Sequence, residues 1–367
     1  MGFKPYTQDL EESVRGFNLR LRAGGNHVDE FPETHLREFP RLPGRNPYDE
    51  SFLFVEGRYV RGGYILRQQI FAICGKIERI AGGPQYAVSE GIVNEDFKIV
   101  GVLLLQHALR QQPLLYALGM GGMKERLPRV LRAMKWTLAK VPFYFKVLNT
   151  ERFLDNMMLF KQSRVRRWLL DLLRRTNLPR GGIRIAQFRT NRADDSTRMD
   201  TVCEFGRWAD SLWERCADKY SFIAARDSET LNTLYPVSNP RFLRLRVLRG
   251  LHTVGWAVVL NTQMSGHKHF GNLRVASIVD CLALPEDATS VIHQATNYLV
   301  GFKPDIIVSN QSSLSWRKSL TGSGFVRGPS NFVLGLSRKL AERLQPFAVL
   351  KDRMHLTRGD GDGPIHL

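Results

Sequence analysis

The sequence predicts an α/β protein in which one architecture, a mixed sheet flanked by helices, is used twice. Strand-like runs rich in β-branched and aromatic residues alternate with segments whose apolar residues recur at helical spacing. The order of these segments in the first half of the chain recurs in the second half. Such alternation favours mixed or parallel sheets covered by helices, and the recurrence predicts two tandem domains.

The composition limits the class of protein and its location. The 367 residues suffice for two domains, and 43% hydrophobic with 24% charged residues is typical of a globular chain. We expect no membrane span, because no apolar run approaches the roughly 20 residues that one needs. The start of the chain does not resemble a secretory signal, and the four cysteines lack paired or metal-ligand spacing. These features predict a cytoplasmic protein with no metal site, with peripheral contact at the inner membrane as an alternative.

The chain is strongly basic. It has 53 Lys and Arg residues against 35 Asp and Glu, which gives a formal net charge of +18 at pH 7. Such a charge attracts anionic partners such as nucleotide cofactors, anionic membranes or nucleic acid, and does not by itself distinguish among them.

The first half begins with a proline-punctuated stretch that ends near residue 50. Its Phe-Pro, Leu-Pro and Asn-Pro pairs predict an extended arm with few regular elements. Beyond it the pattern predicts, in order, one or two strands over 58–74, a strand over 85–93, a helix over 96–109, a strand over 113–118, a helix over 127–136 and a strand over 141–148.

The two halves are joined by a segment that is predicted to be helical and basic, over residues 153–173. Residues 163–175 carry an apolar stripe among arginines. Such a helix either lies on an anionic membrane or packs its stripe on a domain. Leu178-Pro179-Arg180-Gly181-Gly182 then predicts a domain boundary.

The second half repeats the alternation of strands and helices. We predict strands over 183–188, 242–248, 254–260, 275–284, 306–309 and 332–336, and helices over 205–220, 288–299 and 313–320. The predicted organisation is an arm over 1–50, a first domain over 51–150, a basic linker over 151–182, a second domain over 183–345 and a solvated C-terminal tail over 346–367.

This pattern resembles the GNAT superfamily of acyl-CoA-dependent N-acyltransferases. In that family a strand leads through a Q/R-x-x-G-x-G/A loop into a helix whose N-terminus binds the CoA diphosphate, since free amides at a helix start favour anions. In the first half, residues 93–109 match this loop in outline, with Lys98 at the first position and Gly101 at the glycine. The resemblance implies that Lys98, Val100, Gly101 and Val102 bind acetyl-CoA or another acyl-CoA as substrate.

More narrowly, the chain is similar to two-domain GNAT-like proteins associated with bacterial polysaccharide biosynthesis. The segments that carry this similarity are Ser89-Glu90-Gly91, Leu118-Gly119-Met120-Gly121-Gly122, Val279-Asp280-Cys281, Ser309-Asn310-Gln311, Pro329-Ser330-Asn331-Phe332 and Thr357-Arg358-Gly359-Asp360-Gly361-Asp362-Gly363-Pro364.

Acyl transfer to an amine needs a base and a group that stabilises the tetrahedral intermediate. In the resembling family the base often lies on the strand before the CoA loop, where this chain has Glu90 and Asp280. Each is an acid within an apolar run, and burial raises the pKa of a carboxyl group toward the range of a working base. The alternative for both is a structural carboxylate paired with arginine. Asn310 completes the candidate catalytic set, with helix capping as its alternative role.

Four further residues are candidates for substrate binding. Gln311 follows a buried strand where side chains commonly face a ligand crevice. Trp316 either stacks on a sugar or fills the core, and Asn331 either bonds substrate or forms a turn. Arg358, with the nearby aspartates, either reaches into a cleft between the domains or belongs to the solvated tail.

We therefore predict an acyl-CoA-dependent N-acyltransferase that acts on an amino group, such as that of an amino sugar. One alternative is a non-catalytic tandem module in a glycan assembly complex, docked at a membrane surface. Another is an aminoacyl-tRNA-dependent transferase, because such enzymes also use twin GNAT folds and need a basic surface. General nucleic-acid binding is not expected, since no helix-turn-helix or zinc signature is present.

Overall fold

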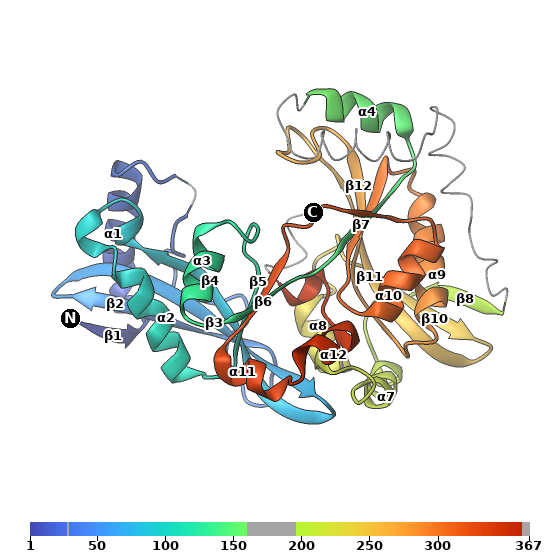
Figure 1. The fold of residues 1–367 in the computed structure, drawn as a ribbon, viewed down its shortest axis with the longest axis horizontal. Helices are drawn as coiled ribbons and strands as arrows, with labels where there is room; N and C mark the ends of the chain where they lie inside the picture. The colour runs from blue at the N-terminus through green and yellow to red at the C-terminus, as the bar shows by residue number, and fades with distance from the viewer. Residues whose placement is uncertain (28, 160–195, 362–367) are drawn as a thin grey trace.

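The computed structural model describes residues 1–27, 29–159 and 196–361, which form two lobes, each built on one β-sheet (Figure 1). Both sheets mix parallel and antiparallel pairs, so the predicted α/β class with mixed sheets is confirmed. The predicted basic helix over 163–175, the boundary at 178–182 and the strand over 183–188 lie outside the described residues. No helix in the described ranges is both long and apolar enough to cross a membrane.

The strand order differs between the lobes. The first sheet runs β1 (Gly2–Pro5), β2 (Tyr48–Glu56), β3 (Tyr59–Ile73), β4 (Lys76–Ser89), β5 (Leu115–Gly119), β15 (Val333–Leu336) and β6 (Thr137–Lys140), with β9 (Phe222–Ala224) paired to β3 and β16 (Met354–His355) paired to β9. The second sheet runs β14 (Val326–Gly328), β7 (Phe143–Val147), β13 (Ile306–Asn310), β12 (Arg274–Ala283), β11 (His252–Gln263), β10 (Leu243–Arg249) and β8 (Thr197–Thr201).

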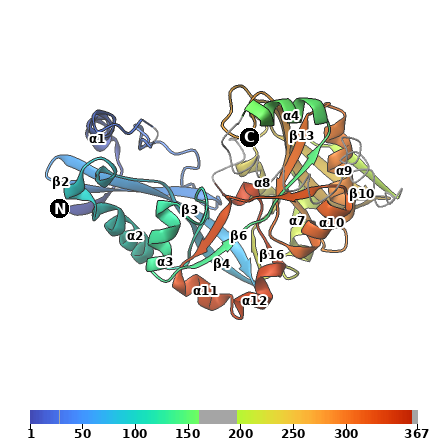
Figure 2. The same ribbon diagram turned by 45° about the horizontal axis from the view of Figure 1, so that its top comes forward.

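The helices cover these sheets. The first lobe carries α1 (Glu11–Ala23), α2 (Val100–Gln111), α3 (Arg126–Ala133) and α11 (Arg338–Arg343), and the second carries α4 (Thr150–Leu159), α7 (Arg207–Cys216), α8 (Ser228–Leu234), α9 (Ala288–Val300) and α10 (Leu314–Gly322). Helix α12 (Phe347–Leu350) follows α11 beneath the junction of the lobes (Figure 2). Helices α2 and α3 share one apolar cluster with the strands of the first sheet, which fixes both on the same face.

The N-terminal arm is more regular than predicted, and the expectation of few regular elements is wrong for residues 2–23. Strand β1 pairs with β2, and α1 buries Val14, Phe17 and Leu21 in a cluster with residues of β2 and β3. These three residues recur at helical spacing, a signal that the prolines further along had obscured. Residues 24–47, where described, contain no helix or strand.

The two halves of the chain exchange strands: the second sheet takes β7 from the first half, and the first sheet takes β9, β15 and β16 from the second half. Strand β7 comes from the first half of the chain but lies between β13 and β14 of the second sheet, with Phe145 opposite Val308 and Val326. Strand β15 comes from the second half but lies between β5 and β6 of the first sheet. The two sheets therefore do not divide at residue 150, and each lobe is completed by the other half of the chain.

In each sheet two adjacent parallel strands separate toward their carboxyl ends. The pairing of β4 with β5 is confined, over the described strands, to Ala81 and Gly82. The pairing of β12 with β13 ends at Ile278 and Ser309. The register shifts along β4 and along β12 at these points, and such bulges bend a strand away from its neighbour. We call the region between the separated strand ends of each lobe its crevice, since such strand ends are where ligands commonly bind in open α/β sheets.

Candidate active site

The crevice of the second lobe is filled by the C-terminal segment of the chain. The His355 Nε2 atom lies 2.7 Å from the carbonyl oxygen of Cys281 on β12. On the β13 side, the Leu356 amide donates to Ser312 Oγ at 2.7 Å. The His355 ring stacks on both Tyr220 and Trp316, with centroid distances of 4.8 and 5.3 Å. The expectation of a solvated tail is therefore wrong for residues 354–360, because their apolar and aromatic contacts bury them.

Asp280, a predicted base, lies at the same crevice and is fully engaged. Its Oδ1 accepts hydrogen bonds from Arg226 Nη2 at 2.9 Å, from Thr357 Oγ1 at 2.9 Å and from the Cys281 amide at 2.9 Å. Its Oδ2 accepts from the Tyr235 hydroxyl at 2.9 Å. The side chain is 2% exposed. A carboxylate with these partners and no solvent access fits the structural alternative better than the role of a base.

A second buried carboxylate, Asp360, shares the same arginine. Arg226 Nη2 lies 2.8 Å from Asp360 Oδ2, and the Thr357 amide donates to that oxygen at 2.8 Å. Burial raises the pKa of Asp360, and the Arg226 guanidinium opposes this. Burial alone would lower the pKa of Arg226, but the attraction of Asp280 and Asp360 outweighs it and raises that pKa. We name Arg226, Tyr235, Asp280, Thr357 and Asp360 the C-terminal lock, since they fasten residues 357–360 to the second lobe.

The structure brings Asn310, Gln311, Trp316 and Arg358 to this region too. Asn310 accepts a hydrogen bond from Arg358 Nη1 at 3.2 Å, Gln311 Nε2 lies 3.3 Å from Cys281 Sγ, and Trp316 Nε1 donates to the Tyr220 hydroxyl at 2.9 Å. All three of Asn310, Gln311 and Trp316 are buried, and Asn310 and Trp316 contact the C-terminal segment directly. Asn331 lies apart from them, exposed and beside Gly122 of the first lobe.

The first lobe presents the start of α2 at the end of its crevice. A Cβ added to Gly101 would lie 3.4 Å from Ser89 Oγ at the end of β4, so the helix start and the strand end are close. The Val102 amide donates to the Ile99 carbonyl oxygen at 3.0 Å, whereas in the described ranges no backbone acceptor is found for the Val100 and Gly101 amides, and the first turn of α2 contains no acidic residue. Val100 is buried, Gly101 is exposed, Val102 is half-buried, and Lys98 is exposed beside Glu95 at 3.5 Å. Such a helix start favours an anion.

The corresponding helix of the second lobe, α9, has a different start. Asp287 occupies its N-cap position, follows Glu286, and forms an ion pair with Arg249 at 2.9 Å. The Asp287 carboxylate does not cap the helix amides, but its negative charge beside them disfavours a bound anion there. The start of α2 is therefore the better diphosphate site of the two.

Glu90, the predicted base of the first lobe, is held by two arginines. Arg20 Nε and Nη2 lie 3.1 and 3.2 Å from its two oxygens, and Arg61 Nη1 lies 3.0 Å from each of them. The carboxylate is 5% exposed. This arrangement ties α1 to β3 and again fits the structural alternative.

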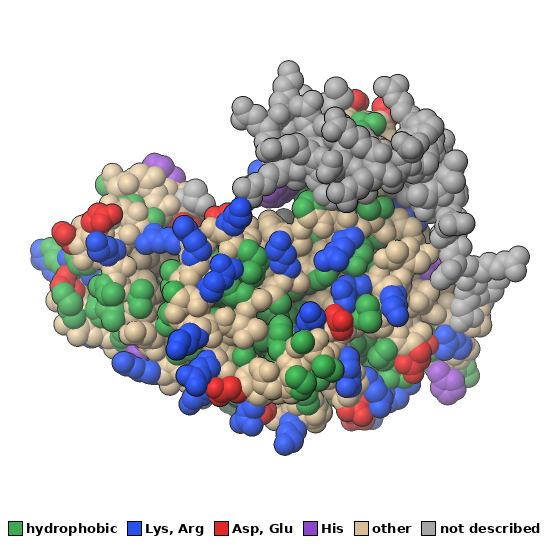
Figure 3. Space-filling view, in the orientation of Figure 1, with side chains coloured by type: hydrophobic (Ala, Val, Ile, Leu, Met, Phe, Trp, Pro, Cys, Tyr) green, Lys and Arg blue, Asp and Glu red, His purple; other side chains and the backbone are tan. Residues whose placement is uncertain are grey.

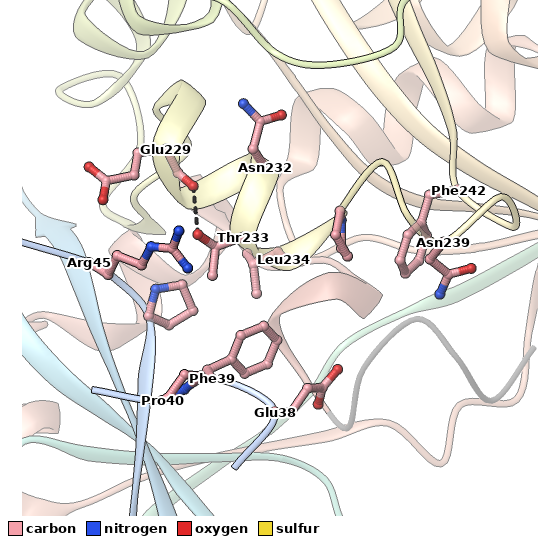
Figure 4. Close-up of a pocket in the computed structure, with 12 residues that line it drawn as sticks. Glu38, Phe39, Pro40, Arg45, Glu229, Asn232, Thr233, Leu234, Asn239 and Phe242 are labelled. Atoms are coloured by element: carbon pink, nitrogen blue, oxygen red, sulfur yellow. Dashed lines mark hydrogen bonds between the residues drawn. The ribbon is translucent and has the colours of Figure 1, made fainter. Parts of the chain in front are cut away.

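A pocket of about 600 Å³ lies where the arm meets the second lobe (Figure 4). Phe39 and Arg45 on the arm face Thr233 and Leu234 of α8 across it. Its other lining residues are Glu38, Pro40, Pro47, Glu229, Asn232, Pro236, Asn239 and Phe242. The pocket therefore combines carboxylates and a guanidinium with aromatic and proline side chains.

This pocket is linked to the crevice of the first lobe by direct contacts. The Arg67 guanidinium lies 4.2 Å from the Phe39 ring centroid, and a Cβ at Gly82 would lie 3.5 Å from Arg67. Gly82 is where β4 leaves β5. On β5, the Tyr116 hydroxyl bonds Gln69 and the Asp360 carbonyl oxygen, each at 2.9 Å. A chain of side-chain contacts thus joins the wall of the pocket, the point where β4 leaves β5 and the C-terminal segment.

Sequence reasoning missed the arginine at the centre of the lock and the lining of the pocket. Arg226 follows the apolar run Phe222-Ile223-Ala224-Ala225, and a charged residue ending such a run is a signal of burial. The pocket residues of the arm lie in the proline-rich stretch, which carries no periodic pattern. In the described ranges, no group of His, Cys, Asp and Glu is arranged to hold a metal ion.

Comparisons with known proteins show the fold. No protein-family model and no curated protein matches the sequence. Among solved structures, the chain is similar to Saccharomyces cerevisiae N-myristoyltransferase with bound myristoyl-CoA, at 10% identity and a TM-score of 0.50, over 91% of this chain and 82% of that one. It is similar to a probable N-acyltransferase from Enterococcus faecalis V583, at 11% identity and a TM-score of 0.52, over 94% and 74%.

A third similar structure is a GCN5-related N-acetyltransferase from Anabaena variabilis, at 10% identity and a TM-score of 0.53, over 91% of this chain and 72% of that one. At these identities the likeness concerns the fold and not the substrate. This structural similarity, together with the two mixed sheets and the parallel strands that separate in each, shows that the protein has the α/β fold of the GNAT-type N-acyltransferases.

Proposed function

We propose that the protein is an acyl-CoA-dependent N-acyltransferase whose acyl-CoA site lies in the first lobe. The observation that carries this assignment is the filled crevice of the second lobe, where His355 bonds the Cys281 carbonyl oxygen of β12 and Leu356 bonds Ser312, just beyond β13. The crevice between β4 and β5 then remains for the acyl chain. The start of α2, with Gly101 exposed and Lys98 nearby, supports binding of the diphosphate there.

We propose further that the amine acceptor enters by the pocket between the arm and α8. Of the two carboxylates, Glu38 already pairs with Arg67 at 3.5 Å, so Glu229 is the group that attracts a protonated amine, and the contacts of Phe39 and Arg67 connect the wall of the pocket to Gly82. An amino sugar of polysaccharide biosynthesis remains the proposed acceptor. In the reaction the bound ammonium first loses one proton to solvent, and the neutral amine then attacks the thioester carbonyl. The C–N bond forms, the C–S bond breaks, the second amine proton leaves to solvent, and CoA departs as the thiolate.

In this proposal Asp280 and Glu90 hold the fold together and are not bases. Asp280 anchors the C-terminal segment, and Glu90 anchors α1. The second lobe then serves as a scaffold whose helix α8 forms one wall of the proposed acceptor pocket. This division of roles is supported by the acidic N-cap of α9 and by the contacts of Asn310, Gln311 and Trp316 with the C-terminal segment and its surroundings.

Titration calorimetry with acetyl-CoA and myristoyl-CoA tests the assignment, using two matched variants. Gly101 and Thr289 are both exposed second residues of their helices, α2 and α9. Gly101→Asp places a carboxylate at the proposed diphosphate site, and we expect it to weaken binding at least tenfold. Thr289→Asp makes the same change at the other helix, and we expect little effect.

Each of the other outcomes is informative. Weakening by Thr289→Asp alone would move the acyl-CoA site to the second lobe. The absence of binding to either acyl-CoA would reject the enzyme proposal and leave the non-catalytic scaffold or the aminoacyl-tRNA-dependent transferase. The filled second crevice favours the scaffold of these two.

A further inference from the structure

A basic surface lies on the first lobe at α3 and β6. Over residues 124–140 the chain has one acid, Glu125, against six basic residues. We call these six the α3–β6 basic face: Lys124, Arg126, Arg129, Arg132, Lys135 and Lys140. All six are exposed. None of them forms an ion pair within the part of the chain that the structure describes, although arginines elsewhere commonly do.

The helix geometry orients half of this face. Arg126, Arg129 and Arg132 follow one another at spacings of three residues, so they lie along one side of α3. Pro128 and Leu131 are buried, so they hold the opposite side against the lobe. Lys and Arg side chains are spread over the middle of the face that carries α3 in the space-filling view (Figure 3).

Strand β6 extends the same surface. It is the last strand of the first sheet, paired on one side with β15. A lysine on an edge strand discourages pairing with another chain, and this role is a sufficient explanation for the presence of Lys140. The three arginines of α3 are not on a strand and have no such role.

Binding of CoA does not account for all of these cations. The diphosphate of CoA is proposed at the start of α2, and its remaining phosphate would engage one or two cations. Six unpaired cations repel each other, so the arrangement is stabilised by a partner with many negative charges. Leu127 is 37% exposed in the middle of this face. An apolar side chain among cations suits the boundary between lipid headgroups and acyl chains better than a phosphate backbone.

We propose that the α3–β6 basic face docks the protein on a bilayer that contains anionic lipid. This surface is formed by residues other than those of the proposed acyl-CoA site and of the predicted basic segment 163–175, which lies outside the described residues. The proposal does not depend on the protein being an acyltransferase. It places α3, next to the first lobe's crevice, toward the membrane.

The test is co-sedimentation of the full chain with vesicles of phosphatidylcholine, with or without phosphatidylglycerol. We expect binding to the phosphatidylglycerol vesicles only, reversed by salt. The triple variant Arg126→Gln/Arg129→Gln/Arg132→Gln removes three basic side chains from the membrane surface. Each such side chain stabilises binding to anionic lipid by roughly 1 kcal/mol, so the partition coefficient should fall about 100-fold. Lys135→Gln/Lys140→Gln, outside the helix, should lower it by more than tenfold without disturbing α3.

The matched control is Arg58→Gln/Arg207→Gln/Arg327→Gln, which removes the same charge from three exposed arginines elsewhere. If the control variant binds phosphatidylglycerol vesicles as tightly as the wild type while the α3 variant does not, the result supports the proposal. An equal loss in the control would show that net charge alone drives binding and would overturn it. Loss by Trp168→Glu with no loss in the α3 variant would assign docking to residues 163–175 instead. Binding of duplex DNA in place of vesicles would also reject it.

Discussion

The C-terminal lock makes a quantitative prediction about Arg226. This side chain is 1% exposed, and its Nη2 atom lies 2.9 Å from Asp280 and 2.8 Å from Asp360, which are 2% and 5% exposed. Replacing it with methionine, in Arg226→Met, leaves two carboxyl groups buried without their countercharge. Breaking a buried pair in this way typically costs 3–5 kcal/mol, so we expect a loss of about 4 kcal/mol in the free energy of unfolding.

Urea unfolding followed by circular dichroism measures this loss, provided that a single transition is observed. Arg338→Met breaks an exposed pair with Glu342 and should cost less than about 1 kcal/mol. The triple variant Arg226→Met/Asp280→Asn/Asp360→Asn removes the uncompensated charges and should recover most of the loss, since neutral replacements of buried ion sets are often nearly neutral. A loss below about 1 kcal/mol in Arg226→Met, or a triple variant no more stable than the single one, would refute the reasoning.

Two further predictions concern the same segment. Burial lowers the pKa of His355 well below 6.5, so its stabilising contribution is present above pH 6.5 and is lost as the pH falls toward the folded-state pKa. Between pH 7 and pH 5.5 this ring contributes up to about 1.4 kcal/mol per pH unit to the decline in the free energy of unfolding. His355→Gln removes that contribution, so the melting temperature of the variant should fall less steeply over this pH range. An unchanged slope would contradict this prediction. Gly359→Ala should destabilise the protein by about 1–3 kcal/mol, because the added Cβ collides with the Tyr235 hydroxyl. Gly16→Ala on α1 should instead stabilise the protein, because its added Cβ makes only an ordinary contact with Arg20 and alanine favours a helix. Thermal melts compare the two variants.

The sequence patterns predicted most strands and helices, because each is defined by the spacing of its own apolar residues. The strand predicted over 141–148 is β7, and the helix predicted over 127–136 is α3, which ends earlier because Lys135 takes a positive φ of 63°. The pattern of Phe143–Val147 indicates a strand but contains nothing that selects a sheet. This segment joins the second sheet because a position between β13 and β14 is vacant there. The residues that create this position lie far along the chain, so the local pattern cannot predict the pairing.

The candidate site was predicted less well for a similar reason. An acid in an apolar run correctly indicates that Asp280 and Glu90 are buried, but burial is compatible with a base and with an ion pair. The partners decide between these roles, and they are distant in sequence, as Arg226 is from Asp280 and Arg20 is from Glu90. Residues 354–360 carry too few apolar residues to predict that they fill a crevice. Their burial depends on the space between β12 and β13, which is a property of the sheet.

The strand exchange implies that neither half of the chain folds alone. A fragment of residues 1–159 would lack β15 between β5 and β6, and its β7 would expose Phe145 and Val147. A fragment of residues 196–367 would lack β7 between β13 and β14 and would expose Leu334 and Leu336 of β15. We expect each fragment to aggregate when expressed alone and the two to co-purify as a 1:1 complex when expressed together. Residues 1–140 keep the position for β15 but lack β7, so they should form that complex more weakly. A soluble fragment with its own cooperative unfolding transition would show instead that each sheet is stable without its exchanged strand.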